Sequence, residues 1–149
     1  MAGYNPPIPA WFMEWGTKAA FVGEIPDEEL GDIRSEDELF DLARDSIAIL
    51  LPKLLDALRK KFHERYHMNA SLGHKTLFYF FESPNALEAI GLTLSIRNRH
   101  VFLNMLYAPY DLNDKIDYSK KVEVKTTVSD PDLAGLALMR LVRDLLSKV

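Results

Sequence analysis

The segment His63–His67 reads His-Glu-Arg-Tyr-His, a string that matches a known catalytic motif. When a His-Glu-x-x-His segment lies on a helix, its two histidines project from one face and bind zinc. The glutamate between them then activates the metal-bound water. The pattern therefore assigns His63 and His67 as metal ligands and Glu64 as the catalytic residue. His74 lies a little further on and is the candidate third ligand.

The surroundings of this motif weigh against a zinc site. The apolar stripe of the preceding helical stretch predicts that both histidines lie on its water-facing side. Lys60, Lys61 and Arg65 add positive charge that disfavours a dication. The recognisable strands also follow the motif, whereas they precede it in the peptidases that the motif resembles. We therefore expect no cofactor and keep a zinc hydrolase as the minority interpretation.

The first 22 residues are predicted to form an arm rich in proline and aromatic side chains. Three prolines between residues 6 and 9 favour an extended backbone. The two tryptophans of the chain, Trp11 and Trp15, flank Phe12. Large aromatic side chains are seldom left in water, so the arm either folds back on its own domain or docks on a partner. We expect these three residues to be protein-binding.

Residues 35–149 are predicted to form one α+β domain, after an acidic linker at residues 23–34. Ser35 and Glu38 make a capping box, which predicts the start of a helix. Pro52 should kink this helical stretch or divide it in two, because proline removes a backbone hydrogen bond. Asp130 before Pro131 predicts the start of a last helix. The three expected helices span 36–51, 52–67 and 131–148.

Between the second and third helices, short segments alternate in the manner of β-strands. They lie near 75–81, 92–97, 101–107 and 121–128. Their order predicts a three- to four-stranded, mainly antiparallel sheet with the helices packed on one face. The second face also carries apolar side chains such as Phe102 and Leu106. It therefore needs a cover, which is either the aromatic arm or a dimer partner.

A third constellation of residues is basic and suggests nucleic-acid binding. Its members are Arg97, Arg99 and His100 in a predicted hairpin turn, and Lys120 and Lys121 near the last strand. Such residues can neutralise phosphates. The formal net charge of −4 argues against nucleic acid as the main partner.

Composition narrows the remaining function classes. The 149 residues contain 48% hydrophobic and 27% charged residues, which is typical of one folded domain. The absence of cysteine excludes disulfides and thiol catalysis. No apolar run has membrane-spanning length and no signal peptide is recognisable, so we expect a cytoplasmic protein. We therefore expect a non-enzymatic module that binds a protein or itself through the aromatic arm and the surface of the sheet, such as an inhibitor, an immunity protein or an accessory subunit.

Overall fold

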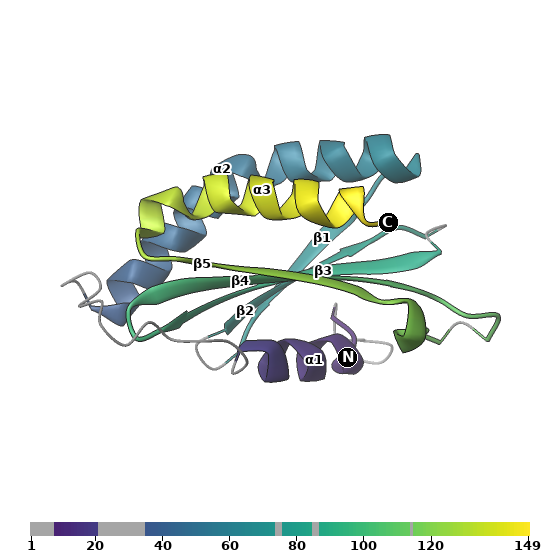
Figure 1. Ribbon diagram of the computed structural model, residues 1–149, viewed down its shortest axis with the longest axis horizontal. Coiled ribbons are helices and arrows are strands. Elements are labelled where there is room, and N and C mark those ends of the chain that lie inside the picture. The colour runs from purple at the N-terminus through teal and green to yellow at the C-terminus, as the bar shows by residue number, and fades with distance from the viewer. Residues whose placement is uncertain (1–7, 21–34, 74–75, 85–86, 114) are drawn as a thin grey trace, which may run out of the picture.

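The computed structural model describes residues 8–20, 35–73, 76–84, 87–113 and 115–149, and it confirms the α+β class. One antiparallel sheet holds five strands in the order β1-β2-β3-β4-β5, so each strand pairs with its neighbours in the chain (Figure 1). The strands are β1 His67–Leu72, β2 Thr76–Glu82, β3 Glu88–Arg97, β4 His100–Pro109 and β5 Val122–Val128. The four predicted strands are present, and β1 is a fifth that the sequence pattern did not predict.

Three α-helices cover this sheet from both sides. They are α1 Ala10–Ala20, α2 Glu36–Phe62 and α3 Ala134–Ser147. Helices α2 and α3 lie side by side on one face, and α1 lies on the opposite face (Figure 1). Two short 3₁₀ helices, Tyr118–Lys120 and Pro131–Leu133, precede β5 and α3. The predicted acidic linker, residues 23–34, lies outside the described residues.

Helix α2 is one continuous helix where the sequence predicted two. It begins as expected, because the backbone amide of Glu38 donates to Oγ of Ser35 at 3.2 Å. The predicted division at Pro52 is wrong, because α2 continues across this residue, although its axis changes direction along its length (Figure 1). Pro52 and Ala48 are both exposed, so the carbonyl that loses its helical donor faces water. The large apolar face of α2 then holds both halves against the sheet.

The predicted extension of this helix to His67 is also wrong. The helix ends at Phe62, and His63 adopts a left-handed backbone with φ 58° and ψ 33°. The amide of His63 donates to the carbonyl of Arg59 at 2.8 Å, which closes the last turn. The following segment enters β1, where His67 pairs with Glu82 of β2. Pairing with β2 therefore overrides the helical pattern of this stretch.

The main core fills the space between the sheet and the α2–α3 layer. Alternate residues of β2, β3 and β4 point into it, including Phe81, Leu92 and Leu103. A smaller cluster on the other face joins α1 to the sheet. Its buried members are Ile8, Phe12, Phe78, Phe80, Ala89 and Leu106. The chain therefore buries apolar side chains on both faces of one sheet.

Gly91 shapes the contact between α1 and the sheet. A Cβ atom at this position would lie 2.0 Å from Cε1 of Phe12. Glycine therefore leaves a notch in β3 in which the Phe12 ring rests.

No described helix is long and apolar enough to cross a membrane.

Candidate functional site

The predicted zinc residues do not share a helical face. His63 caps α2 and His67 is the first residue of β1, so the spacing that would align two ligands on a helix does not apply. The side chains of both histidines are exposed. His74 lies outside the described residues. Within the described ranges, no three His, Cys, Asp or Glu side chains are grouped to hold a metal ion.

Hydrogen bonds within the chain hold the segment between α2 and β1. Oε2 of Glu64, the predicted catalytic residue, accepts a hydrogen bond from Oγ of Ser83 at 2.8 Å. Tyr66 is 5% exposed, and its hydroxyl donates to a carboxylate oxygen of Glu88. Burial, reinforced by Glu88, raises the pKa of Tyr66 well above its ordinary value. Glu64 and Tyr66 thus tie the segment to the sheet.

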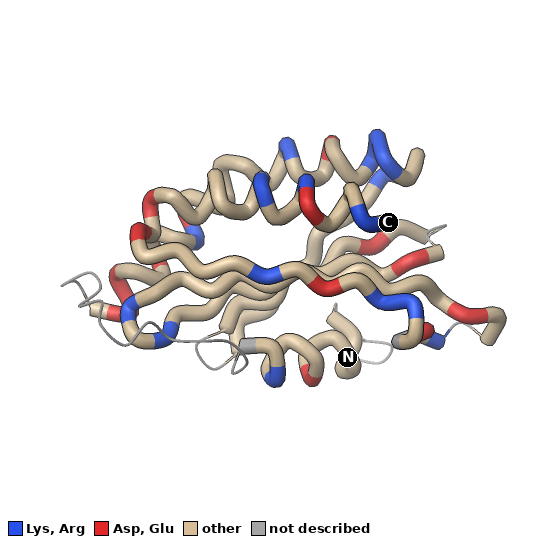
Figure 2. Tube along the Cα trace, in the orientation of Figure 1, with Lys and Arg blue, Asp and Glu red and all other residues tan. Residues whose placement is uncertain are grey.

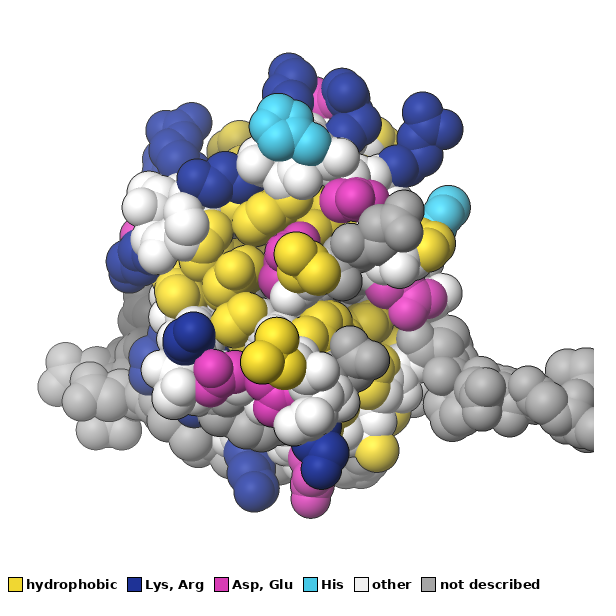
Figure 3. Space-filling model, turned by 90° about the vertical axis from the view of Figure 1, so that its right-hand side faces the viewer, with side chains coloured by type: hydrophobic (Ala, Val, Ile, Leu, Met, Phe, Trp, Pro, Cys, Tyr) yellow, Lys and Arg dark blue, Asp and Glu magenta, His cyan; other side chains and the backbone are white. Residues whose placement is uncertain are grey.

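The end of the molecule around this segment combines basic and apolar surface. An open hollow of about 490 Å³ is lined by Arg59, Lys60, His63, Glu64 and Arg65. Figure 3 shows basic side chains and a histidine along its upper rim, above an area of apolar side chains. Leu87 and Leu112 are exposed in the loops that precede β3 and β5. This end is open to solvent and does not enclose a site.

The predicted protein-binding aromatics contact the sheet of their own chain. Phe12 is completely buried, and its ring lies 5.4 Å from that of Phe80 and 5.5 Å from that of Trp15. Trp11 and Trp15 are partly buried. Nε1 of Trp15 donates to Oε1 of Glu123 in β5 at 2.6 Å. Contact of these residues with a partner stays a prediction, and the Phe12 ring is enclosed by α1 and the sheet.

The structure separates the five predicted nucleic-acid-binding residues into two groups. Arg97, Arg99 and His100 lie at the β3–β4 turn. Lys120 and Lys121 precede β5, whose first residue Val122 pairs with Tyr107 near the other end of β4. About seven residues of β4 lie between the groups, or roughly 23 Å at ~3.3 Å per residue. These residues do not form one patch.

Arg97 is held against the sheet on the α1 side. Its guanidinium carbon lies 4.3 Å from the centroid of the Phe102 ring, a cation–π arrangement. Burial lowers the pKa of Arg97 from its ordinary value. Its Nε and Nη2 are buried without a hydrogen-bond partner in the described part of the chain, as are the hydroxyls of Thr93 and Ser95. The Arg97 guanidinium thus lies flat on the protein rather than projecting toward a phosphate.

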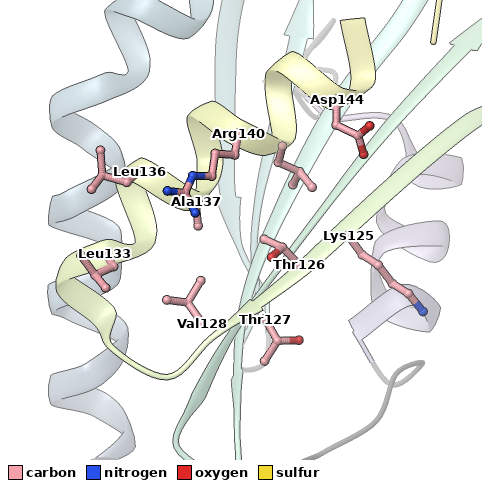
Figure 4. A pocket seen from close by; sticks show the side chains of 10 residues that line it. Lys125, Thr126, Thr127, Val128, Leu133, Leu136, Ala137, Arg140 and Asp144 are labelled. Carbon is pink, nitrogen blue, oxygen red and sulfur yellow. The ribbon is translucent and has the colours of Figure 1, made fainter. Parts of the chain in front are cut away.

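A groove between β5 and α3 is the surface best suited to hold another molecule. It encloses about 470 Å³ and is lined partly by Thr126, Val128, Leu136, Ala137 and Arg140. Figure 4 shows α3 running above β5, with Leu133 at one end of the groove and Asp144 at the other. Its walls combine apolar side chains with two charged residues of α3, Arg140 and Asp144, and one of β5, Lys125. This combination suits a peptide-like ligand better than a small polar one.

Strand β5 forms the outer edge of this groove and also an edge of the sheet. Its partner is β4, and no described strand pairs with its other side. Its backbone donors and acceptors on that side are therefore free to pair with another strand. Among the five strands, β5 is the only one with charged side chains in its interior, Glu123 and Lys125 (Figure 2).

Helical spacing of apolar residues predicts that Leu133 and Leu136 belong to the buried stripe of the last helix, which gives no indication of this groove. They are 47% and 60% exposed. The buried residues of α3 are Ala134, Gly135, Leu138, Leu141, Val142 and Leu145. These face α2 and the sheet, so the apolar stripe of the helix is wider than its buried face. That excess width was the signal for a surface groove.

Comparisons with models of protein families, with curated protein sequences and with solved structures found no match for this chain. Its function is therefore inferred from the surfaces described above.

Proposed function

We propose that this protein acts by binding a protein chain along β5. The bound chain adds a strand to the sheet and places side chains in the groove between β5 and α3. The observation that carries the proposal is the open edge of β5 beside an apolar groove. Strand addition is a recurrent mode of peptide recognition, in which backbone hydrogen bonds supply affinity and side-chain pockets supply specificity.

The groove provides the specificity that an edge strand lacks by itself. Exposed Leu133 and Leu136 can be buried by alternate apolar side chains of a bound strand. Arg140 and Asp144 lie one helical turn apart on α3 and line the same groove. They offer a cation and an anion to the polar positions of that strand.

The surface that we favour differs from the one predicted from the sequence. The prediction placed binding on the sheet surface and on the aromatic arm, with Trp11, Phe12 and Trp15 as the binding residues. In the structure, the Phe12 ring fills the notch at Gly91. Trp15 donates a hydrogen bond to Glu123, so α1 contacts β5, the strand with the open edge. We therefore assign α1 a supporting role and β5 the binding role.

A photo-crosslinking amino acid at Thr127 of β5 tests the proposal in the cell. Thr127 is exposed and lies on the open edge strand. Ala70 of β1 is the matched control, because it is exposed on the opposite edge strand. We expect a covalent adduct of defined mass at position 127 and none at position 70. The adduct should disappear when Leu136, on the groove, is changed to Asp.

Two results would contradict the proposal. One is the absence of any adduct at position 127. The other is an adduct that forms equally at position 70 or that persists in the Leu136→Asp variant. Because Leu136 is exposed, this variant should unfold at the same temperature as the wild-type protein. A melting curve checks that any loss of the adduct does not come from unfolding.

A further inference from the structure

We infer that the chain bound along β5 is β5 of a second copy of this protein, so that two sheets join into one. This inference rests on the proposed function and names its partner. The two copies of β5 would run antiparallel, related by a two-fold axis perpendicular to the sheet. The self-complementary charge pattern of β5 carries the argument.

A two-fold axis of this kind restricts the registers that two β5 strands can adopt. It keeps like faces of the two sheets together, so each residue must oppose a residue on the same face. Side chains alternate between faces along a strand, so the axis must pass beside one residue, which then faces itself. The candidates for that position are the two charged residues of β5 and the residue between them: Glu123, Val124 and Lys125.

Charge selects one of the three registers. With Lys125 on the axis, two lysines would oppose each other. With Glu123 on the axis, two glutamates would oppose each other and Lys121 would face Lys125. With Val124 on the axis, Glu123 of each copy lies opposite Lys125 of the other. Opposite charges directly across a strand pair stabilise it and like charges destabilise it. A lysine on an edge strand normally disfavours pairing with another strand. In this register, however, each Lys125 pairs with Glu123 of the other copy.

The side chains that this register pairs are available. Lys125 is exposed and forms no ion pair with another described residue. Oε1 of Glu123 accepts a hydrogen bond from Nε1 of Trp15 at 2.6 Å and forms an ion pair with Nζ of Lys121 at 3.3 Å. Its Oε2 is therefore left for Lys125 of the second copy. On the other face, Val124 meets Val124 and Val122 meets Thr126.

The groove explains how so short a strand pair becomes a stable interface. Stable protein interfaces bury about 1,200 Å² or more, which exceeds the contribution of one short pair of strands. Helix α3 packs above β4 and β5, so the axis brings the two copies of α3 together on one face. They run antiparallel, which directs Arg140 of each copy toward Asp144 of the other. Contact between the two copies of α3 then adds to the surface that the strand pair buries.

A charge-swap series measured by sedimentation velocity tests this inference. We expect wild-type protein to be a dimer in the micromolar range. Lys125→Glu and Glu123→Lys should each weaken the dimer about tenfold or more, because each places two like-charge pairs across the axis. The double variant Glu123→Lys/Lys125→Glu should regain the dimer, since it reverses both pairs. Mixing the two single variants should also yield a heterodimer.

Each outcome bears on a distinct part of the inference. A monomeric wild-type protein, or a dimer unaffected by both single variants, overturns self-pairing through β5. Failure of the double variant to regain the dimer overturns the register at Val124. Glu123→Lys also removes the acceptor of Trp15, so Lys125→Glu is the cleaner of the two single variants. Circular dichroism checks that each variant is folded.

The crosslinking adduct at position 127 separates failure of this inference from failure of the proposed function. An adduct of twice the mass of the chain supports both. An adduct of another mass, together with monomeric purified protein, overturns self-pairing and retains protein binding at β5. No adduct and no dimer overturn both.

Discussion

The two faces of the sheet are both covered, but they are built differently. On the α2–α3 face, mainly aliphatic side chains form one large cluster with 22 fully buried members. On the α1 face, six buried residues form the cluster, and aromatic rings dominate it. Unpartnered hydroxyls of Thr93 and Ser95 lie on the strand beneath α1. Because the first face buries more apolar side chains, we expect it to supply most of the stability, whereas the second depends on the fit of one helix.

The largest test of this comparison uses two neighbouring residues of β2. Phe81 points into the α2–α3 face and Phe80 into the α1 face, and both are at most 2% exposed. Phe81→Ala should lower the free energy of unfolding by about 3–5 kcal/mol, as expected for a large cavity in a well-packed core. Phe80→Ala should cost less, because α1 can settle into the space. Urea denaturation measures both values, and equal losses would contradict the difference between the faces.

Two glycines allow a test of whether close packing matters on both faces of the sheet. Gly135 lies where α3 meets α2, and Gly91 lies where α1 meets the sheet. A Cβ atom on Gly135 of α3 would lie 2.6 Å from the backbone oxygen of Ser46, and one on Gly91 would lie 2.0 Å from the Phe12 ring. Each Gly→Ala substitution should cost about 1–3 kcal/mol through overpacking. The backbone oxygen of Ser46 belongs to α2 and cannot rotate away. The ring of Phe12, by contrast, can be replaced by a smaller side chain.

Phe12→Leu should therefore relieve Gly91→Ala, giving a positive coupling in a double-mutant cycle. The same Phe12→Leu substitution should leave the cost of Gly135→Ala unchanged. If the cycle between positions 12 and 91 shows no coupling, the notch at Gly91 does not determine how α1 is seated.

An alkaline titration of wild type and a Tyr79 variant probes the α2–α3 face. Burial raises the pKa of Tyr79 to about 12 from an ordinary value of 10.0. The unfolded chain therefore loses this proton at lower pH than the folded chain does. Stability from this group is complete below pH 10.0 and is lost as the pH rises toward 12, by about 2–3 kcal/mol. Tyr79→Phe should flatten the fall in unfolding free energy between these values, whereas a slope that matches wild type would contradict the shift.

The smallest effect concerns the hydrogen bond that joins α1 to β5. Trp15→Phe keeps an aromatic ring and removes the donor to Glu123. We expect a loss of about 0.5–1 kcal/mol, because the bond is exposed to water. Glu123→Gln retains an acceptor and should cost less. Thermal unfolding compares the two variants, and a larger loss in Glu123→Gln would show that charge rather than the hydrogen bond matters here.

Much of the fold was readable from local patterns. The hydrogen bond from the amide of Glu38 to Ser35 and the β3–β4 hairpin are confirmed. Asp130 and Pro131 begin a 3₁₀ helix, and α3 starts three residues later than predicted, at Ala134. In each case neighbouring residues contain the whole signal. The predictions that failed involve residues whose conformation depends on distant partners. Strand β1 continues a helical pattern in the sequence, and only pairing with β2 makes it a strand.

The candidate site was much less predictable than the fold. The zinc motif requires one helix that carries both His63 and His67. Helix α2 ends at Phe62, before both histidines. In the sequence, the alternation of Lys121, Glu123 and Lys125 indicates no more than an exposed strand face. Its place at the edge of the sheet, beside α3, is visible only in the structure and is what our proposal rests on.

Local patterns in the sequence predicted the α+β class, four of the five strands and the start of α2. These follow from hydrophobic period and from capping, which act over a few residues. The tertiary structure alone decided that α2 passes through Pro52, that β1 joins the sheet and that Leu133 and Leu136 remain exposed. The physical reason is that burial and strand pairing are properties of distant segments brought together, and no single stretch of sequence contains them.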